Sequence, residues 1–134
     1  FKGHIPEGDG PIMGLLLVEL ISESRKTLNE LVEDLLKDVG PAYYERADLR
    51  LSRPVAKAEM TDFLVKKAPA SIGEEKVVDV SKKDGVKYIM ADDSWLLIRP
   101  SGTEPVLRVY AEGRSQQMVK SLLDYGQQVA ASVV

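Results

Sequence analysis

The sequence has 134 residues, 44% of them hydrophobic, and its 18 lysines and arginines against 21 aspartates and glutamates give a net charge of −3. This length suits one domain of ordinary size, or a small domain with part of another, and excludes a complete dinucleotide-binding enzyme. The acidic balance argues against broad nucleic-acid binding, although it allows a local basic pocket. The lack of cysteine and the single histidine exclude disulfides, thiolate or histidine-clustered metal sites and a cysteine nucleophile.

The first predicted element is a helix that is apolar on every side. Asp9 supplies its cap and Pro11 its first turn, and the apolar run extends from Ile12 to Ile21. A helix of this kind belongs inside a protein, with neighbours on more than one face. The run is about half of the ~20 residues that cross a bilayer and lacks the marks of a signal peptide, so we expect no membrane partner and a cytoplasmic location.

A second helix is predicted from the capping box of Thr27 and Glu30 to the stop at Gly40, with apolar residues at helical spacing on one side. Two helices without a strand make an incomplete unit, since nothing in residues 1–41 can cover the first of them. The chain opens on Phe1 instead of Met, so we expect the sequence to be a piece of something longer.

Residues 42–134 contain a self-sufficient set of elements. Alternating or apolar runs predict strands at 47–51, 77–80, 86–91, 94–98 and 107–111. Helices are predicted between Pro54 and Pro69 and from Ser115 onward, with 70–76 as a loop, Asp84-Gly85 in a hairpin turn and Asp92-Asp93 in a second turn. This order indicates an α+β fold, an antiparallel sheet with helices on one face.

The loop between the last two predicted strands has the composition of a phosphate pocket. Arg99 offers a fork of N–H donors, Ser101 and Thr103 add hydroxyls, and Gly102 lets successive backbone N–H groups point into one concavity. Arg108 would add a second positive charge. The same residues are also typical of a plain inter-strand loop, and composition alone favours that interpretation over a phosphate pocket.

The whole string around this loop resembles a known family. IRPSGTEP at residues 98–105, followed by LRVYAEG at 107–113, is similar to the C-terminal phosphate-binding loop of the α-D-phosphohexomutases, the phosphoglucomutase/phosphomannomutase family. FKGHIPEGDG at residues 1–10 resembles the segment after that family's sugar-recognition loop, in its third domain. Two motifs in the family's order cover most of the chain.

The resemblance implies a four-domain enzyme that interconverts hexose 1-phosphates and 6-phosphates through an active-site phosphoserine and a bisphosphorylated sugar, with Mg²⁺ bound. Residues 1–41 would then be the last two helices of the third domain, an α/β domain, and 42–134 the complete fourth domain. The phosphoserine loop, metal-binding aspartates and sugar-reading loop would precede Phe1, so this part would bind no metal and be inactive alone. Arg99, Ser101, Gly102 and Thr103, supported by Arg108, would grip the phosphate that is not being transferred.

Relatives often carry Lys or Arg where this chain has Gly8, before Asp9-Gly10. Lys2 and His4 are the remaining candidates for proton transfer in that segment, and a hydrogen-bonded loop role for His4 stays open. The expected partners are a hexose phosphate and the rest of the same protein. Without the rest of the protein, we expect the chain to self-associate through Ile12–Ile21. Phosphoglucosamine is an alternative substrate. A different class also stays open, namely a stand-alone α+β binding module whose exposed first helix docks a partner.

Overall fold

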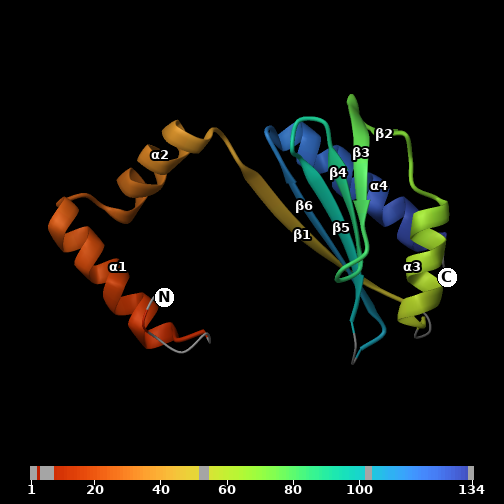
Figure 1. The fold of residues 1–134 in the computed structure, drawn as a ribbon, viewed down its shortest axis with the longest axis horizontal. Helices are drawn as coiled ribbons and strands as arrows, with labels where there is room; N and C mark the ends of the chain where they lie inside the picture. Colours follow the sequence, from red (N-terminus) through yellow and green to blue (C-terminus); the bar gives the residue numbers. More distant parts are fainter. Residues whose placement is uncertain (1–2, 4–7, 52–54, 102–103, 133–134) are drawn as a thin grey trace. The chain divides into compact units, whose positions relative to one another are not determined.

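The computed structural model describes residues 3, 8–51, 55–101 and 104–132. The chain divides into two compact units, Phe1–Gly40 and Pro41–Val134. Figure 1 shows the first unit as two helices and the second as a sheet with two further helices. Each unit is described by itself below.

The two helices of the first unit begin at the predicted caps. Helix α1, Gly10–Ser24, starts where the Asp9 carboxylate accepts a hydrogen bond from the backbone N–H of Ile12 at 3.1 Å. Helix α2, Leu28–Val39, starts with a complete capping box: the Thr27 hydroxyl accepts from the Glu30 N–H at 3.3 Å, and the Glu30 carboxylate accepts from the Thr27 N–H at 2.7 Å. These bonds satisfy amide donors that have no partner within the helix. Because the capping residues can be recognised in the sequence, both helix starts were predicted correctly.

Neither of these helices buries a residue. In α1 the side chains of Leu15 and Val18 are 69% and 63% exposed, and Met13, Leu17 and Leu20 are exposed as well. The sequence predicted a helix with neighbours on more than one face, but the described part of this unit has no sheet or third helix to supply them. In the described residues, no helix has both the length and the hydropathy needed to span a membrane.

The second unit is built on one antiparallel sheet in the order β1-β6-β5-β4-β3-β2. Its strands are β1 (Tyr43–Arg50), β2 (Ser71–Ile72), β3 (Glu75–Ser81), β4 (Val86–Met90), β5 (Trp95–Pro100) and β6 (Val106–Gly113). The last four strands follow one another along the chain and pair as neighbours. Strand β1 instead pairs with β6, far away in sequence, so that the chain enters this unit at one edge of the sheet.

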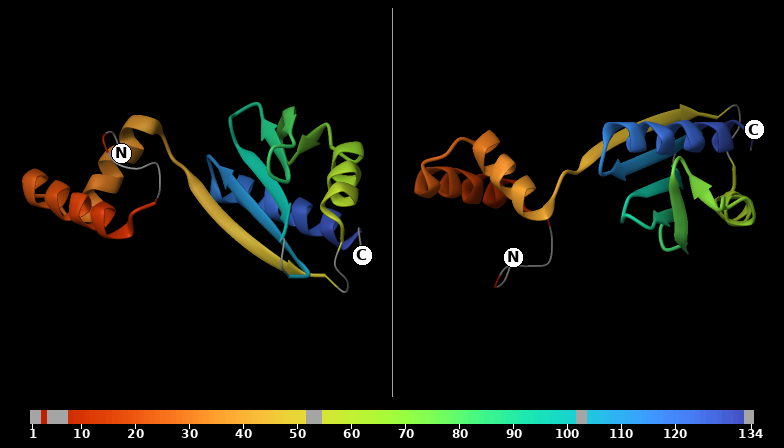
Figure 2. Two further views of the ribbon diagram at one scale, coloured as in Figure 1. Left: turned by 60° about the horizontal axis from the view of Figure 1, so that its bottom comes forward. Right: turned by 90° about the horizontal axis from the view of Figure 1, so that it is seen from above.

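Two helices cover the same face of this sheet, α3 (Lys57–Lys66) and α4 (Gln116–Ala131), as predicted (Figure 2). Tyr88 of β4 contacts both helices. Its phenol donates to the Leu64 carbonyl of α3 at 2.7 Å, and its ring packs edge-on against the Tyr125 ring of α4, with 6.2 Å between the ring centres. Burial raises the pKa of this phenol. The core consists of alternate strand residues and the inner sides of the helices: Met60, Leu64, Ile72, Val86, Tyr88, Met90, Leu96, Ile98, Leu107, Val109, Ala111, Val119, Leu122, Leu123 and Ala130.

Several predicted boundaries were wrong. Strand β1 begins at Tyr43, four residues before the predicted strand, because long-range pairing with β6 extends it into a stretch without apolar alternation. The predicted loop at 70–76 contains β2 and the start of β3. Helix α3 begins at Lys57 and ends at Lys66, inside the two prolines that were expected to bound it; Pro54 lies outside the described residues. The helical spacing after Ser115 predicts that Met118 and Val129 are buried, but both are only half-buried.

The other face of the sheet, called the open face here, carries no helix of the described part of this unit. It presents the alternate strand residues that do not enter the core: Tyr44, Arg46 and Asp48 of β1, Lys87 and Ile89 of β4, Trp95, Leu97 and Arg99 of β5, and Arg108, Tyr110 and Glu112 of β6. Aromatic and charged side chains pack against one another on this face. The Lys87 ammonium lies 4.0 Å from the centre of the Trp95 ring, and the Trp95 indole donates to Glu112 at 3.2 Å.

Candidate functional site

Two of the predicted phosphate-binding residues are direct neighbours across the sheet. Arg99 near the end of β5 pairs with Arg108 near the start of β6, so both side chains rise from the open face. Like charges directly opposite each other in a sheet destabilise it unless counter-charges or a bound anion compensate. This position of the fold therefore favours an anionic group.

Each of these arginines has a carboxylate beside it. A terminal nitrogen of Arg99, Nη1, lies 3.0 Å from the Asp84 carboxylate, and Nη2 of Arg108 lies 4.0 Å from that of Glu104. Asp48, the cross-strand neighbour of Arg108 on β1, is instead held by the Arg46 guanidinium, which donates to it at 2.7 Å and lowers the pKa of its carboxyl. Since the carboxylates nearly balance the arginines, an incoming phosphate must compete with them.

Arg108 has a buried donor that no described residue satisfies. Its side chain is one-third exposed, but its Nε is buried and has no hydrogen-bond partner among the described residues. A buried donor without an acceptor costs about 1–3 kcal/mol.

The loop between β5 and β6 is closed at its base by backbone hydrogen bonds. The Ser101 N–H donates to the Val106 carbonyl at 2.8 Å, which closes the loop, and the N–H of Leu51, just after β1, donates to the Pro105 carbonyl at 2.8 Å, which ties the loop to the neighbouring strand. The Ser101 N–H is therefore used in closing the loop; the N–H groups of Gly102 and Thr103, on which the predicted concavity depends, lie outside the described residues. The hydroxyl is the group that Ser101 can offer to a ligand.

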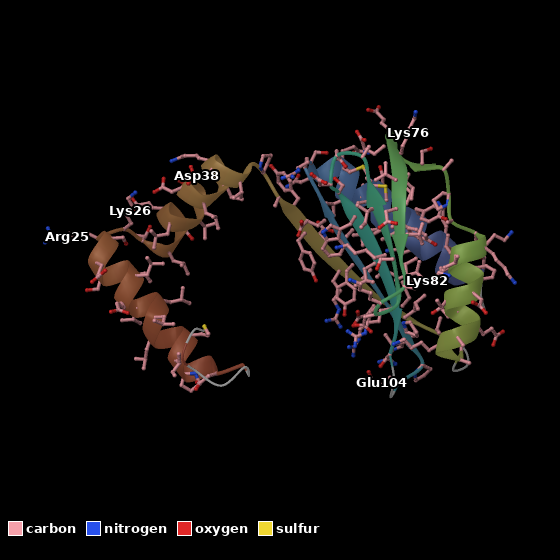
Figure 3. All side chains as sticks on the ribbon, viewed as in Figure 1. Arg25, Lys26, Asp38, Lys76, Lys82 and Glu104 are labelled. Atoms are coloured by element: carbon pink, nitrogen blue, oxygen red, sulfur yellow. The ribbon has the colours of Figure 1, made fainter. Side chains whose placement is uncertain are left out.

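The remaining predicted site residues lie outside the described residues. These are Lys2, His4, Gly102 and Thr103. Gly8 is described and exposed, directly before the Asp9 cap of α1. The structure thus brings together Arg99, Arg108 and Ser101 of the predicted set, at the end of the sheet where Figure 3 labels Glu104.

Sequence reasoning missed the part played by the β3–β4 turn. Asp84 was predicted only as a turn residue, yet its carboxylate is the counter-charge of Arg99. The signal was present in the register, because Asp84-Gly85 directly precedes Val86, which pairs with Ile98. The next position of this antiparallel register places Gly85 opposite Arg99.

Arg50, at the end of β1, was not predicted as a site residue but lies beside the loop. It lines a hollow of about 350 Å³ beside the loop, together with Leu51, Glu104, Pro105 and Val106. A second hollow of about 300 Å³ lies at the opposite end of the sheet, where Glu74, Glu75 and Asp92 line it. Arg114 lines it as well, but three carboxylates against one guanidinium make this second hollow a poor phosphate site. Across the described ranges, no three acidic or histidine side chains gather in a way that would hold a metal ion.

Residues 50–125, more than half of the chain, match the family model of the phosphoglucomutase/phosphomannomutase C-terminal domain. The chain belongs to the phosphoglucomutase/phosphomannomutase family. This match includes β6, the loop and the turn that surround Arg99, and the α+β architecture agrees with that domain.

Relatives within the phosphoglucomutase/phosphomannomutase family carry several names. The chain is 33% identical over 126 residues to a phosphoglucomutase/phosphomannomutase of Thermococcus kodakarensis, covering 94% of this chain and 25% of that one. It is 36% identical over 121 residues to a phosphoglucosamine mutase of Methanococcus aeolicus, covering 88% and 24%. A phosphoglucosamine mutase of Limosilactobacillus fermentum is 28% identical over 134 residues, covering 100% and 25%. The chain therefore spans about a quarter of the length of these relatives.

Proposed function

We propose that this chain is the C-terminal phosphosugar-binding part of a phosphohexomutase, and that it holds the substrate phosphate that is not being transferred. The observation that carries the proposal is the cross-strand pair of Arg99 and Arg108 at the base of the loop. A guanidinium fork matches phosphate oxygens, and two of them side by side can take opposite edges of one phosphate. Gly102 and Thr103 complete the proposed grip.

In this proposal the chain's own residues position the substrate and make or break no bond. Binding energy from a remote phosphate orients the sugar for the reaction elsewhere, which lowers the barrier by restricting motion. The parent enzyme would interconvert hexose 1-phosphate and 6-phosphate through a phosphoserine and a bisphosphorylated sugar, in the cytoplasm. This part alone would be inactive. Lys2 or His4 would take part in proton transfer at the sugar only in the whole enzyme.

The parent would use Mg²⁺, whose role is to neutralise charge at the transferred phosphoryl group. The described residues of this chain do not fit that ion, since they contain no cluster of three candidate ligands. No step assigned to this chain passes through a metal.

The substrate of the parent is a hexose phosphate, and two relatives compared above are named phosphoglucosamine mutases. Glucose or mannose phosphate is the first proposal and glucosamine phosphate the alternative. The distinction lies in the sugar and not in the phosphate, so the Arg99 and Arg108 pair would serve either substrate equally.

The test is an NMR amide titration of the chain with inorganic phosphate, then glucose 1-phosphate, then glucosamine 1-phosphate. Two or three charge-assisted hydrogen bonds in competition with Asp84 and Glu104 give an expected Kd of about 1 mM. Saturable shifts are expected at Ser101, Arg99 and Arg108, with similar affinity for all three ligands. Shifts that are absent, or that spread evenly over the surface, would contradict a phosphate grip in this chain.

The domain assignment is part of the same proposal. Residues 1–41 would be the end of the third domain, an α/β domain whose sheet covers α1 in the parent, and 42–134 the fourth domain. The exposure of Leu15 and Val18 and the fourfold greater length of the relatives support it. A stand-alone binding module with a docking helix is the second candidate, which the same exposure favours.

The chain on its own is expected to self-associate through α1 and to bind the dye ANS. Val18→Glu should weaken both severalfold, because it places a charge within the exposed apolar surface of the helix. Val78→Glu is a matched control: Val78 of β3 is 62% exposed, against 63% for Val18, and lies in the other unit. Sedimentation velocity measures the association, and a strictly monomeric chain that does not bind ANS would show that α1 has no unmet apolar surface.

A further inference from the structure

We propose that Asp84 is a positioning residue, which holds the Arg99 guanidinium in the orientation that receives phosphate. This inference rests on the proposed function and names a residue that acts through Arg99 without touching the ligand. It is carried by two independent contacts between the β3–β4 turn and β5, one through the backbone and one through the side chain.

The backbone contact fixes where the turn lies. Gly85 is buried and has φ +87°, a left-handed conformation that favours glycine. A Cβ at this position would stand 2.5 Å from the Ile98 carbonyl oxygen and 3.1 Å from Cα of Arg99. The turn is therefore seated directly on the backbone of β5 at Arg99, and the Asp84 carboxylate next to it is placed by the fold and not by a flexible surface segment.

The side-chain contact fixes one end of the guanidinium. One oxygen of Asp84, Oδ2, lies 3.0 Å from Nη1 of Arg99, and the other, Oδ1, lies 3.5 Å from Nζ of Lys57 at the start of α3. The two oxygens of the carboxylate are thus divided between two cations. The Nε and Nη2 edge of Arg99 makes no ion pair among the described residues, so it remains available as a fork for phosphate.

Stability does not account for this arrangement. The Asp84 and Arg99 side chains are 52% and 45% exposed, and ion pairs at this exposure add little to folding because water screens them. The benefit lies in binding, since an arginine with a restricted set of rotamers loses less conformational freedom when a ligand arrives. The cost is a negative charge close to the phosphate.

Two neutral variants separate these effects. Asp84→Asn removes the charge but keeps an amide oxygen that can accept from Nη1, so the orientation of Arg99 is retained and phosphate should bind at least as tightly as in the unaltered chain. Asp84→Ala removes both charge and acceptor. Its Kd for inorganic phosphate is expected to be about threefold to tenfold weaker than that of Asp84→Asn.

The experiment is a phosphate titration of the unaltered chain and both variants, read from the amide signals of Ser101 and Arg108. The Nε–H signal of Arg99 gives a second readout: it should be sharp and shifted in the unaltered chain and in Asp84→Asn, and averaged toward the free-arginine value in Asp84→Ala. Lys57→Ala serves as control, because it removes the other partner of Asp84 and should change the Kd by less than about twofold. Trp95 fluorescence verifies that each variant is folded.

Equal or tighter binding by Asp84→Ala than by Asp84→Asn would overturn the proposal, since Asp84 would then act only as a competing charge. If the unaltered chain binds no phosphate, the proposed function fails for this chain, while the Arg99 Nε–H signal still decides whether Asp84 orients the guanidinium. An averaged signal in the unaltered chain, or one unchanged in Asp84→Ala, would refute the positioning role by itself.

Discussion

Arg99→Ala is expected to weaken the binding of inorganic phosphate by tenfold or more, enough to take it beyond a measurable range. A charge-assisted hydrogen bond contributes about 1.5–3 kcal/mol, and each 1.4 kcal/mol is a factor of ten in Kd. The substitution also leaves the Asp84 carboxylate without its counter-charge, so the local field becomes less favourable to an anion. In the parent enzyme the same change should lower kcat/KM for a hexose phosphate.

Two further variants sharpen this result. Arg99→Lys keeps the charge and loses the planar fork, so intermediate affinity is expected. Lys120→Ala removes one positive charge from an exposed position of α4, away from the loop, and should leave the Kd unchanged. A phosphate affinity that falls equally in Arg99→Ala and Lys120→Ala would mean that only net charge matters and that the loop is an ordinary turn.

Gly126→Val is expected to cost about 3 kcal/mol of folding free energy in the second unit. Gly126 is buried in α4, and even a Cβ there would lie 2.5 Å from a methyl group of Val109 and 3.4 Å from one of Leu96. The helix would have to move away from the sheet, because β6 is fixed by pairing on both sides. A loss of this size is a large part of the stability of a domain this small and should lower its Tm by more than about 10 °C.

Thermal unfolding followed by Trp95 fluorescence measures this effect, since the chain has one tryptophan and it lies in β5. Gln128→Ala, at an exposed position two residues further along α4, should shift the Tm by no more than about 2 °C. A Gly126→Val protein with an unchanged Tm would show that α4 does not rest on β6 as closely as the Val109 contact requires.

Elements governed by local interactions could be predicted from the sequence. The caps at Asp9, Thr27 and Ser115 are each a side chain that accepts from an amide three residues further on, so the three helix starts were right. Strand β1 was half missed because only its second half alternates, and its first half is fixed by β6. The exposure of α1 was expected, since the sequence offers nothing in residues 1–41 that could cover an apolar helix.

In the candidate site, too, the residues that lie close together in the sequence could be predicted, and those brought together by long-range contacts could not. Arg99, Ser101 and Arg108 were predicted as site residues from a short stretch of sequence, and the pairing of Arg99 with Arg108 follows from the β5–β6 register. Asp84 was not found, because its role depends on where the preceding turn meets β5, and its residue type is equally typical of any hairpin turn. Use of the Ser101 N–H in loop closure likewise depends on the Val106 carbonyl across the loop.

The pairing of β1 with β6 also has a consequence for synthesis on the ribosome. The paired residues are roughly 55 to 70 positions apart, so β1 has no partner until nearly the whole domain has been made. At typical translation rates this is a wait of about 3 to 14 s. An unpaired strand is prone to join other chains, but β1 carries Glu45, Arg46, Asp48 and Arg50 among its eight residues. Its alternating charges keep the nascent strand hydrated until β6 emerges.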